Sequence, residues 1–239
     1  MKLRIASLAL AGMLAVAGTA VAETVLKLVP NSDLKLLDPV FTPEGITVQH
    51  GLMIYETLFA WDEALAPKPQ MVGAYTVSPD KLTYVFTLRD GQAFHDGQKL
   101  TSKDVVTSLN RWMARDVMGQ KLRDNMASIE ATDDKTVTLK LKRVYPWVEF
   151  SLASASGNPP VIMRDKDAQT DPGKAVTEAV GSGPFVFSQA DWVPGSKVVY
   201  KKNTAYMPRA EAPSGLAGGR VVKVDRVEWH VNQIGRAHV

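Results

Sequence analysis

The chain has 239 residues, 45% of them hydrophobic, with 17 glycines and 14 prolines. This composition supports a substantial buried core and excludes a low-complexity or disordered chain. The formal net charge of +3 falls to zero once Lys2, Arg4 and Arg236 are set aside for the reasons given below. The basic isoelectric point, near 9.0, therefore does not indicate nucleic-acid binding.

The first 22 residues have the pattern of a secretory signal peptide. Lys2 and Arg4 precede an apolar run that ends at Ala20-Val21-Ala22, a small-x-small exit typical of signal-peptidase cleavage. An uncleaved membrane anchor is the alternative, but the Ala and Gly content of the run favours cleavage before Glu23. The chain has no cysteine, hence neither disulfides nor the thiol that lipidation needs, so we expect a soluble periplasmic protein.

Periodicity predicts a mixed α/β or α+β chain without internal repeats. Period-two alternation and turn residues indicate strands and hairpins, whereas apolar residues at spacings of three and four indicate helices. In chain order we expect a strand at 24–29, a helix at 45–59, a hairpin at 75–88, a helix beginning at the capping residue Thr101, a hairpin at 129–142, and strands at 185–187, 197–201 and 224–231. Thr101 and Asp104 fit the start of that second helix, where a hydroxyl accepts a backbone N–H and an acidic side chain favours the first turn.

The last six residues, 234–239, look foreign to the rest of the chain. Ile-Gly-Arg-Ala-His-Val is what a common sequencing-adaptor read encodes, and the predicted strand before it has no following element. We therefore expect a natural protein that continues past about Gln233, and an adaptor-derived tail at 234–239. A genuine, chance C-terminus is the alternative.

A long ordered set of motifs resembles the peptide/nickel-type extracellular solute-binding proteins, family 5. The resemblance covers nearly all of residues 24–231. The matching segments are Tyr55 to Phe59, Tyr75 to Ser78, Leu82 to Gly91, Phe94 to Gly97, Leu100-Thr101, Asp104 to Val106, Ser108 to Arg111 and Gly181 to Phe185. Two departures are Pro79-Asp80-Lys81, where many members have an acidic residue and glycine, and the missing lipidation cysteine.

The resemblance implies a periplasmic binding protein type II-like lobe that carries an inserted small α+β domain, with the second lobe largely missing from this chain. By analogy the first lobe would consist of residues 23–60 and 180–233, and the inserted domain of residues 61–179. It also implies hinge closure of two lobes on a ligand, with delivery to a membrane permease.

Two loops are candidate ligand contacts. Asn31, Ser32, Asp33 and Leu34 follow the first strand, and binding residues in open α/β sheets gather beyond strand ends. Ser182 and Gly183 lie in a glycine-rich turn whose backbone N–H groups could cradle an anion, although such a turn before a strand is more often only a turn. A third polar loop, Ser154 to Asn158, is a weaker candidate.

Catalytic and metal sites have little support in the sequence. His95 beside Asp96 could form an acid–base pair, but adjacent residues rarely aim at one another and no nucleophile is marked nearby. The four histidines are scattered, and neither a serine-hydrolase elbow nor a P-loop occurs. We expect no enzyme, no cofactor and no resident metal.

The sequence thus predicts the periplasmic solute-binding component of an ABC importer. The ligand would be a small peptide or peptide-like solute, the partners a permease and ATPase complex in the inner membrane, and the protein a monomer that binds no nucleic acid. A periplasmic ligand-sensing or scaffold protein without transport is one alternative, and a hydrolase using His95 and Asp96 is another.

Overall fold

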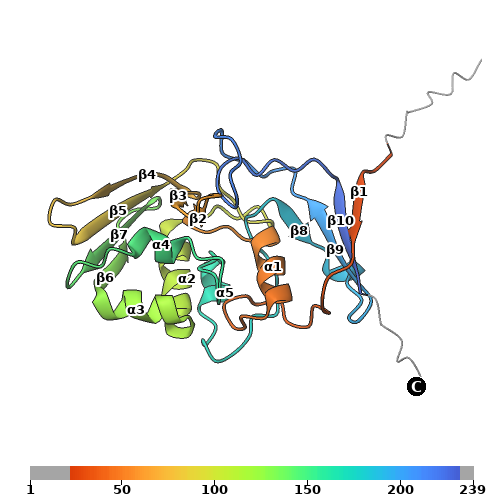
Figure 1. Cartoon of the computed structure of the whole chain (residues 1–239), viewed down its shortest axis with the longest axis horizontal. Helices are drawn as coiled ribbons and strands as arrows, with labels where there is room; N and C mark the ends of the chain where they lie inside the picture. The colour runs from red at the N-terminus through yellow and green to blue at the C-terminus, as the bar shows by residue number, and fades with distance from the viewer. Residues whose placement is uncertain (1–21, 232–239) are drawn as a thin grey trace, which may run out of the picture.

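The computed structural model describes residues 22–231 (Figure 1). The predicted adaptor-derived tail at 234–239 lies outside the described residues. The predicted signal peptide also lies outside them, apart from Ala22.

The first sheet joins the two ends of the described chain. Its strands, in spatial order, are β1 (Val25–Leu28), β10 (Arg226–His230), β9 (Lys197–Lys202) and β8 (Phe185–Phe187). β1 runs parallel to β10, with Leu26 opposite Val227, and the other neighbours are antiparallel. Residues about two hundred positions apart are therefore adjacent at this edge, on the right of Figure 1.

Helix α1 (Gly45–Ile54) packs against this sheet at β8. His50, fully buried on α1, faces Phe187 edge-on and lies 2.9 Å from the Tyr200 hydroxyl through its Nδ1. The helix ends five residues earlier than its apolar spacing predicted. Its last carbonyl, that of Ile54, accepts the N–H of Gly183 (2.9 Å), and Tyr55 already has extended geometry.

After α1 the chain forms a small two-stranded ribbon, β2 (Phe59–Trp61) with β3 (Pro67–Pro69), and then a second sheet. The strands of this second sheet, in spatial order, are β4 (Val72–Val77), β5 (Thr83–Leu88), β7 (Thr136–Leu141) and β6 (Met126–Ala131). All three pairings are antiparallel, and Tyr84, Phe86 and Leu88 alternate inward as the sequence predicted. Both predicted hairpins are confirmed, each beginning three residues earlier than expected.

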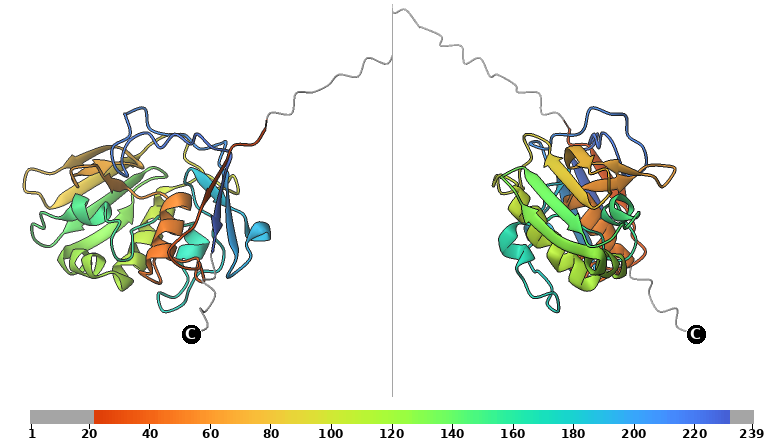
Figure 2. Two further views of the ribbon diagram at one scale, coloured as in Figure 1. Left: turned by 45° about the vertical axis from the view of Figure 1, so that its right-hand side comes forward. Right: turned by 90° about the vertical axis from the view of Figure 1, so that its left-hand side faces the viewer.

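Helices α2 (Ser102–Arg115) and α3 (Val117–Asn125) cover one face of the second sheet (Figure 2). The predicted start of α2 is confirmed, with its hydrogen bonds centred on the Asp104 carboxylate, which accepts the Thr101 N–H at 2.8 Å and its hydroxyl at 2.7 Å. The short elements α4 (Val148–Leu152), α5 (Asp165–Ala168) and the 3₁₀ turn Gln189–Asp191, like α3, were not predicted. The mixed α/β class is confirmed.

A buried ion pair connects the loop before α1 to helix α2. Asp38 and Arg111 are almost fully excluded from water and meet at 2.6 and 3.2 Å. Asp38 also accepts the N–H groups of Val40 (3.0 Å) and Val176 (2.8 Å). Every oxygen of this carboxylate is thus satisfied, and the pair fixes the position of α2 relative to the first segment.

Candidate functional site

Two of the four candidate side chains in the loop after β1 are open to solvent. Asn31 and Ser32 are exposed, whereas Leu34 is fully buried in the core. The Asp33 carboxylate accepts the N–H of Gly195 at 3.0 Å, which ties this loop to the β8–β9 connection. Of the four candidate contacts in this loop, Asn31 and Ser32 are therefore exposed, Asp33 is half-buried, and Leu34 serves packing.

The Gly181-Ser182-Gly183 turn is pressed against the end of α1. A Cβ at Gly181 would lie 1.8 Å from the Ile54 carbonyl oxygen, and one at Gly183 would lie 2.8 Å from the Ile54 carbonyl carbon. The Gly183 N–H is bound to Ile54, and the Gly183 carbonyl accepts the Asn203 side-chain N–H at 3.0 Å. Close approach of two backbone segments, rather than anion binding, accounts for the glycines.

His95 holds the same turn from the other side. Its backbone N–H donates to the Gly181 carbonyl (2.8 Å), its Nδ1 lies 3.2 Å from the Gly181 N–H, and its Nε2 lies 3.1 Å from the Gly183 carbonyl. A neutral ring with the proton on Nε2 satisfies both ring contacts, accepting at Nδ1 and donating from Nε2. Burial lowers the pKa of His95, which agrees with this neutral form.

Asp96 points to a different partner. Its carboxylate lies 2.9 Å from the buried Arg164 guanidinium, which also binds Asp167 and Glu178. Although partial burial opposes it, hydrogen bonds from the Gln98 N–H and from Arg164 lower the pKa of Asp96. His95 and Asp96 are thus both occupied in structural contacts, and no acid–base pair forms between them.

The two predicted ligand-contact loops are held in place by different parts of the structure. The loop containing Asn31 and Ser32 is tied to Gly195, whereas the turn containing Ser182 is tied to α1 and His95. Ser182 is buried, and its hydroxyl has no hydrogen-bond partner within residues 22–231. No hydrogen bond in the described chain connects the two groups.

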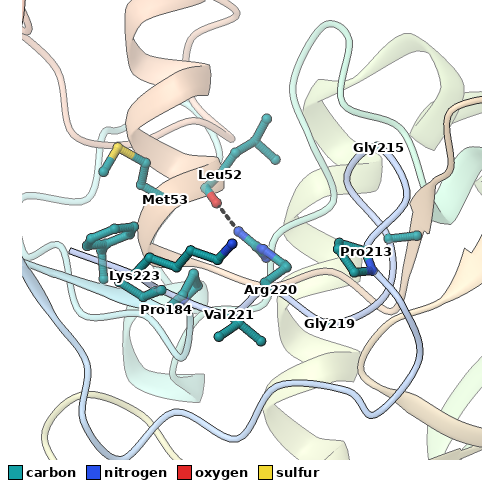
Figure 3. Close-up of a pocket in the computed structure, with 12 residues that line it drawn as sticks. Leu52, Met53, Pro184, Pro213, Gly215, Gly219, Arg220, Val221 and Lys223 are labelled. Carbon is teal, nitrogen blue, oxygen red and sulfur yellow. Dashed lines mark hydrogen bonds between the residues drawn. The ribbon is translucent and has the colours of Figure 1, made fainter. Parts of the chain in front are cut away.

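A pocket of about 660 Å³ opens at the C-terminal end of α1 (Figure 3). Its walls come from the end of α1, the start of β8 and the segment 213–223. They are mostly apolar, and the lining residues are Leu52, Met53, Pro184, Phe185, Pro213, Gly215, Ala217, Gly219, Arg220, Val221, Val222 and Lys223. A volume of this size suits a small organic ligand.

The Arg220 guanidinium, which lines this pocket, is held by its own hydrogen bond and ion pair. It donates to the carbonyl of Leu52 and lies 3.4 Å from the Glu56 carboxylate. Glu56 is buried and also contacts Arg89 (3.5 Å), Gln70 (3.3 Å) and the hydroxyl of Tyr206 (2.5 Å). One carboxylate thus holds together the end of α1, the second sheet and the segment that leads to β10.

Sequence reasoning missed the pocket. Residues 208–219 are rich in proline and glycine, and nothing in their sequence pattern places them against α1. The available signal was Tyr55-Glu56-Thr57, where an acidic residue lies between apolar core positions.

Within residues 22–231, no three His, Asp or Glu side chains are grouped as a metal site would require. None of the helices in that range has the length and apolar composition needed to span a bilayer.

Comparison with known proteins identifies relatives over most of the chain. The profile of the bacterial extracellular solute-binding proteins, family 5, middle region, matches residues 66–235. A probable peptide ABC transporter periplasmic-binding protein of Sinorhizobium fredii is 43% identical over 215 residues, which cover 90% of this chain and 40% of that protein. The glutathione-binding protein of Salmonella typhi is 30% identical over 195 residues, 79% of this chain and 37% of that one. The chain therefore spans about 40% of the length of these curated relatives.

Solved structures agree with the sequence relatives. A periplasmic binding protein of A. tumefacien R10, solved with agropinic acid, shares 26% identity with a TM-score of 0.68, over 87% of this chain and 39% of its own. A periplasmic binding protein associated with an ABC transporter of Helicobacter pylori, solved with the peptide STSA, shares 25% identity with a TM-score of 0.67, over 88% of this chain and 43% of its own. The fold of residues 22–231 is therefore that of a portion of a periplasmic binding protein.

Proposed function

This chain belongs to the bacterial extracellular solute-binding proteins of family 5, and we propose that it is part of a receptor that captures a small peptide or peptide-like solute for an ABC importer. The match that carries this proposal is the 43% identity over 215 residues to a probable peptide ABC transporter periplasmic-binding protein. Relatives of the chain are solute-binding proteins, and the one His–Asp dipeptide that resembled an acid–base pair is divided between two structural networks.

The sheets and their connections support a lobed receptor. We propose that residues 23–60 and 180–233 form the first lobe, since β1 pairs with β10 and α1 packs on β8, and that residues 61–179 form the inserted domain around the second sheet. A solute that contacts both this lobe and a second one would stabilise a closed state, which is the state a permease and its ATPase would receive. We place the protein in the periplasm, as a monomer.

Asn31 and Ser32 are the residues we propose for solute contact, because they are open to solvent beyond the end of β1. Ser182 and Gly183 belong to the same proposal only as support for the end of α1. Their own contacts leave little for a ligand: the Gly183 N–H and carbonyl are both engaged.

The test is solute binding by the full-length gene product. A panel of di- to pentapeptides is screened by thermal shift and then by calorimetry, and a specific ligand raises the melting temperature by mass action. Replacing both Asn31 and Ser32 by Ala weakens the affinity about tenfold, as the loss of two hydrogen bonds predicts. Gln120→Ala, on the exposed side of α3, is the matched control and leaves affinity unchanged.

Two results would contradict the proposal. Release of peptide fragments during the incubation, seen by mass spectrometry, would point to a hydrolase. Tight binding without solute uptake by cells that express the neighbouring transporter genes would favour a sensing or scaffold protein.

A further inference from the structure

The pocket at the end of α1 combines apolar walls with two cationic side chains. Leu52, Met53 and Val221 contribute aliphatic surface, while Arg220 and Lys223 contribute positive charge. No aspartate or glutamate lines it. Figure 3 shows the Lys223 side chain extended across the pocket toward Arg220.

The charge of Arg220 is already compensated. Its guanidinium lies 3.4 Å from the buried carboxylate of Glu56 and donates to the Leu52 carbonyl, so it also serves the free carbonyls at the C-terminal end of α1. Lys223 has no such partner. Among residues 22–231 the nearby basic residue Arg226 is paired with Glu23 and Glu228, whereas Lys223 takes part in no ion pair or hydrogen bond.

Because Glu56 compensates Arg220, the Lys223 ammonium is the cationic group of this pocket that is left without an anion among residues 22–231. A carboxylate is the simplest anion to accept from the three N–H donors of Lys223 and from the outer edge of Arg220. The remaining pocket, lined by Leu52, Met53 and Val221, suits a branched aliphatic group attached to that carboxylate.

We propose that this pocket binds a small carboxylate with an apolar body, its carboxylate on Lys223 and Arg220 and its aliphatic part against α1. A free carboxylic acid and the C-terminus of a short peptide share this chemistry. The site does not include Asn31 or Ser32, and its occupation is independent of which solute the transporter carries.

The test uses the chain from Glu23 and four probes: N-acetyl-leucine, its uncharged amide, the dipeptide Ala-Leu and isopentylamine. Titration by NMR to about 10 mM covers the weak affinities expected of ligands this small. N-acetyl-leucine should bind about tenfold more tightly than its amide, the difference that a charge-assisted hydrogen bond contributes. Comparing Ala-Leu with N-acetyl-leucine separates a peptide terminus from a free acid as the preferred source.

Substitutions of Lys223 test whether this side chain binds the carboxylate. Lys223→Gln should reduce the affinity for the acid about tenfold and leave that for the amide unchanged, whereas Lys121→Gln, exposed on α3, should change neither. Lys223→Glu should abolish binding of the acid, and isopentylamine, which has the wrong charge, should not bind the unchanged protein. Lys223 is exposed, so both variants are expected to fold, and circular dichroism checks this.

Absence of any acid binding at 10 mM, about the weakest affinity the titration detects, would overturn the proposal. So would equal affinities for acid and amide, or an unchanged preference in Lys223→Glu. None of these results bears on peptide capture by the full-length receptor, which is tested separately at Asn31 and Ser32.

Discussion

The buried pair of Asp38 and Arg111 provides the sharpest test of how this fold is held together. Both side chains are excluded from solvent, with exposed fractions of 0% and 1%, and they meet through two hydrogen bonds of 2.6 and 3.2 Å. Arg111→Met leaves the carboxylate buried without its cation. Removing one partner of such a pair costs about 3–5 kcal/mol. Because Asp38 keeps the N–H groups of Val40 and Val176, we expect the lower end, about 3 kcal/mol.

Asp38→Asn should cost a similar amount, since the Arg111 cation then lies buried without an anion, beside neutral acceptors that include the Thr170 and Lys174 carbonyls at 3.1 and 2.9 Å. The double variant removes both charges together. Its loss should be smaller than the sum of the single losses by about 2 kcal/mol or more, which is the coupling expected of residues in direct contact.

Urea unfolding, followed by circular dichroism at pH 7, measures the four free energies of unfolding. The matched control is the exposed pair Lys99 and Asp134, whose side chains are 61% and 78% exposed, and whose replacement should change little. Single losses below about 1 kcal/mol at Asp38 and Arg111, or strictly additive losses in the double variant, would refute the reasoning.

Three further predictions concern other contacts. Gly181→Ala should lower the free energy of unfolding by about 3 kcal/mol, because its Cβ would lie 1.8 Å from the Ile54 carbonyl oxygen. The control Gly45→Ala, whose Cβ would have no atom within 4 Å, should be neutral or slightly stabilising. Equal effects of the two substitutions in urea unfolding would contradict this prediction. Burial lowers the pKa of His50 to about 3, below its ordinary 6.5, so the unfolded chain binds the proton first as the pH falls. The free energy of unfolding should therefore be unaffected by His50 above pH 6.5 and should decline by about 1.4 kcal/mol per pH unit below it. His50→Gln should flatten that decline, and an unchanged slope would point to other groups. Asp104→Ala removes the carboxylate that accepts the N–H groups of Thr101 (2.8 Å) and Asp165 (2.7 Å). It should lower the free energy of unfolding, measured by thermal unfolding, by about 2 kcal/mol. A loss no larger than that of the control Asp124→Ala would count against the capping role.

Local chemistry made much of the fold predictable. The alternation at Tyr84, Phe86 and Leu88 predicts a strand with one buried face, and turn residues such as Pro79 and Asp80 mark where it reverses. The start of α2 at Thr101 follows from its own side chains. These features depend on residues within about ten positions of one another, which is the range that periodicity reports.

Helix α1 shows where local reasoning fails. Its apolar spacing continues to Phe59, yet the helix ends at Ile54, because the Gly183 N–H, far away in sequence, takes the carbonyl of Ile54. The short helix α3 begins at Asp116, whose carboxylate accepts the N–H groups of Met118 and Gly119 at 2.8 and 3.1 Å. Asp116 is a residue type that caps helices, but the apolar pattern of α3 is too weak for the helix to be predicted from the sequence.

The candidate site divides in the same way. Asn31 and Ser32 are proposed as contacts because they follow a strand, whereas the roles of Leu34 and His95 required coordinates, since burial and hydrogen-bond partners depend on segments far along the chain. The pocket at the end of α1 brings together three segments that no spacing rule relates. Lys223 became a candidate for ligand binding only when the structure placed it beside Arg220.

By itself the sequence determined the family, the strands of the two four-stranded sheets, the start of the capped helix and the polar loop after β1, because each rests on neighbouring residues or on an ordered set of motifs. Only the tertiary structure decided that β1 pairs with β10, that Glu56 joins three segments and that a pocket with two cationic side chains opens at the C-terminal end of α1. Those contacts arise when segments up to two hundred residues apart share one core, and their geometry is set by packing that local patterns do not encode.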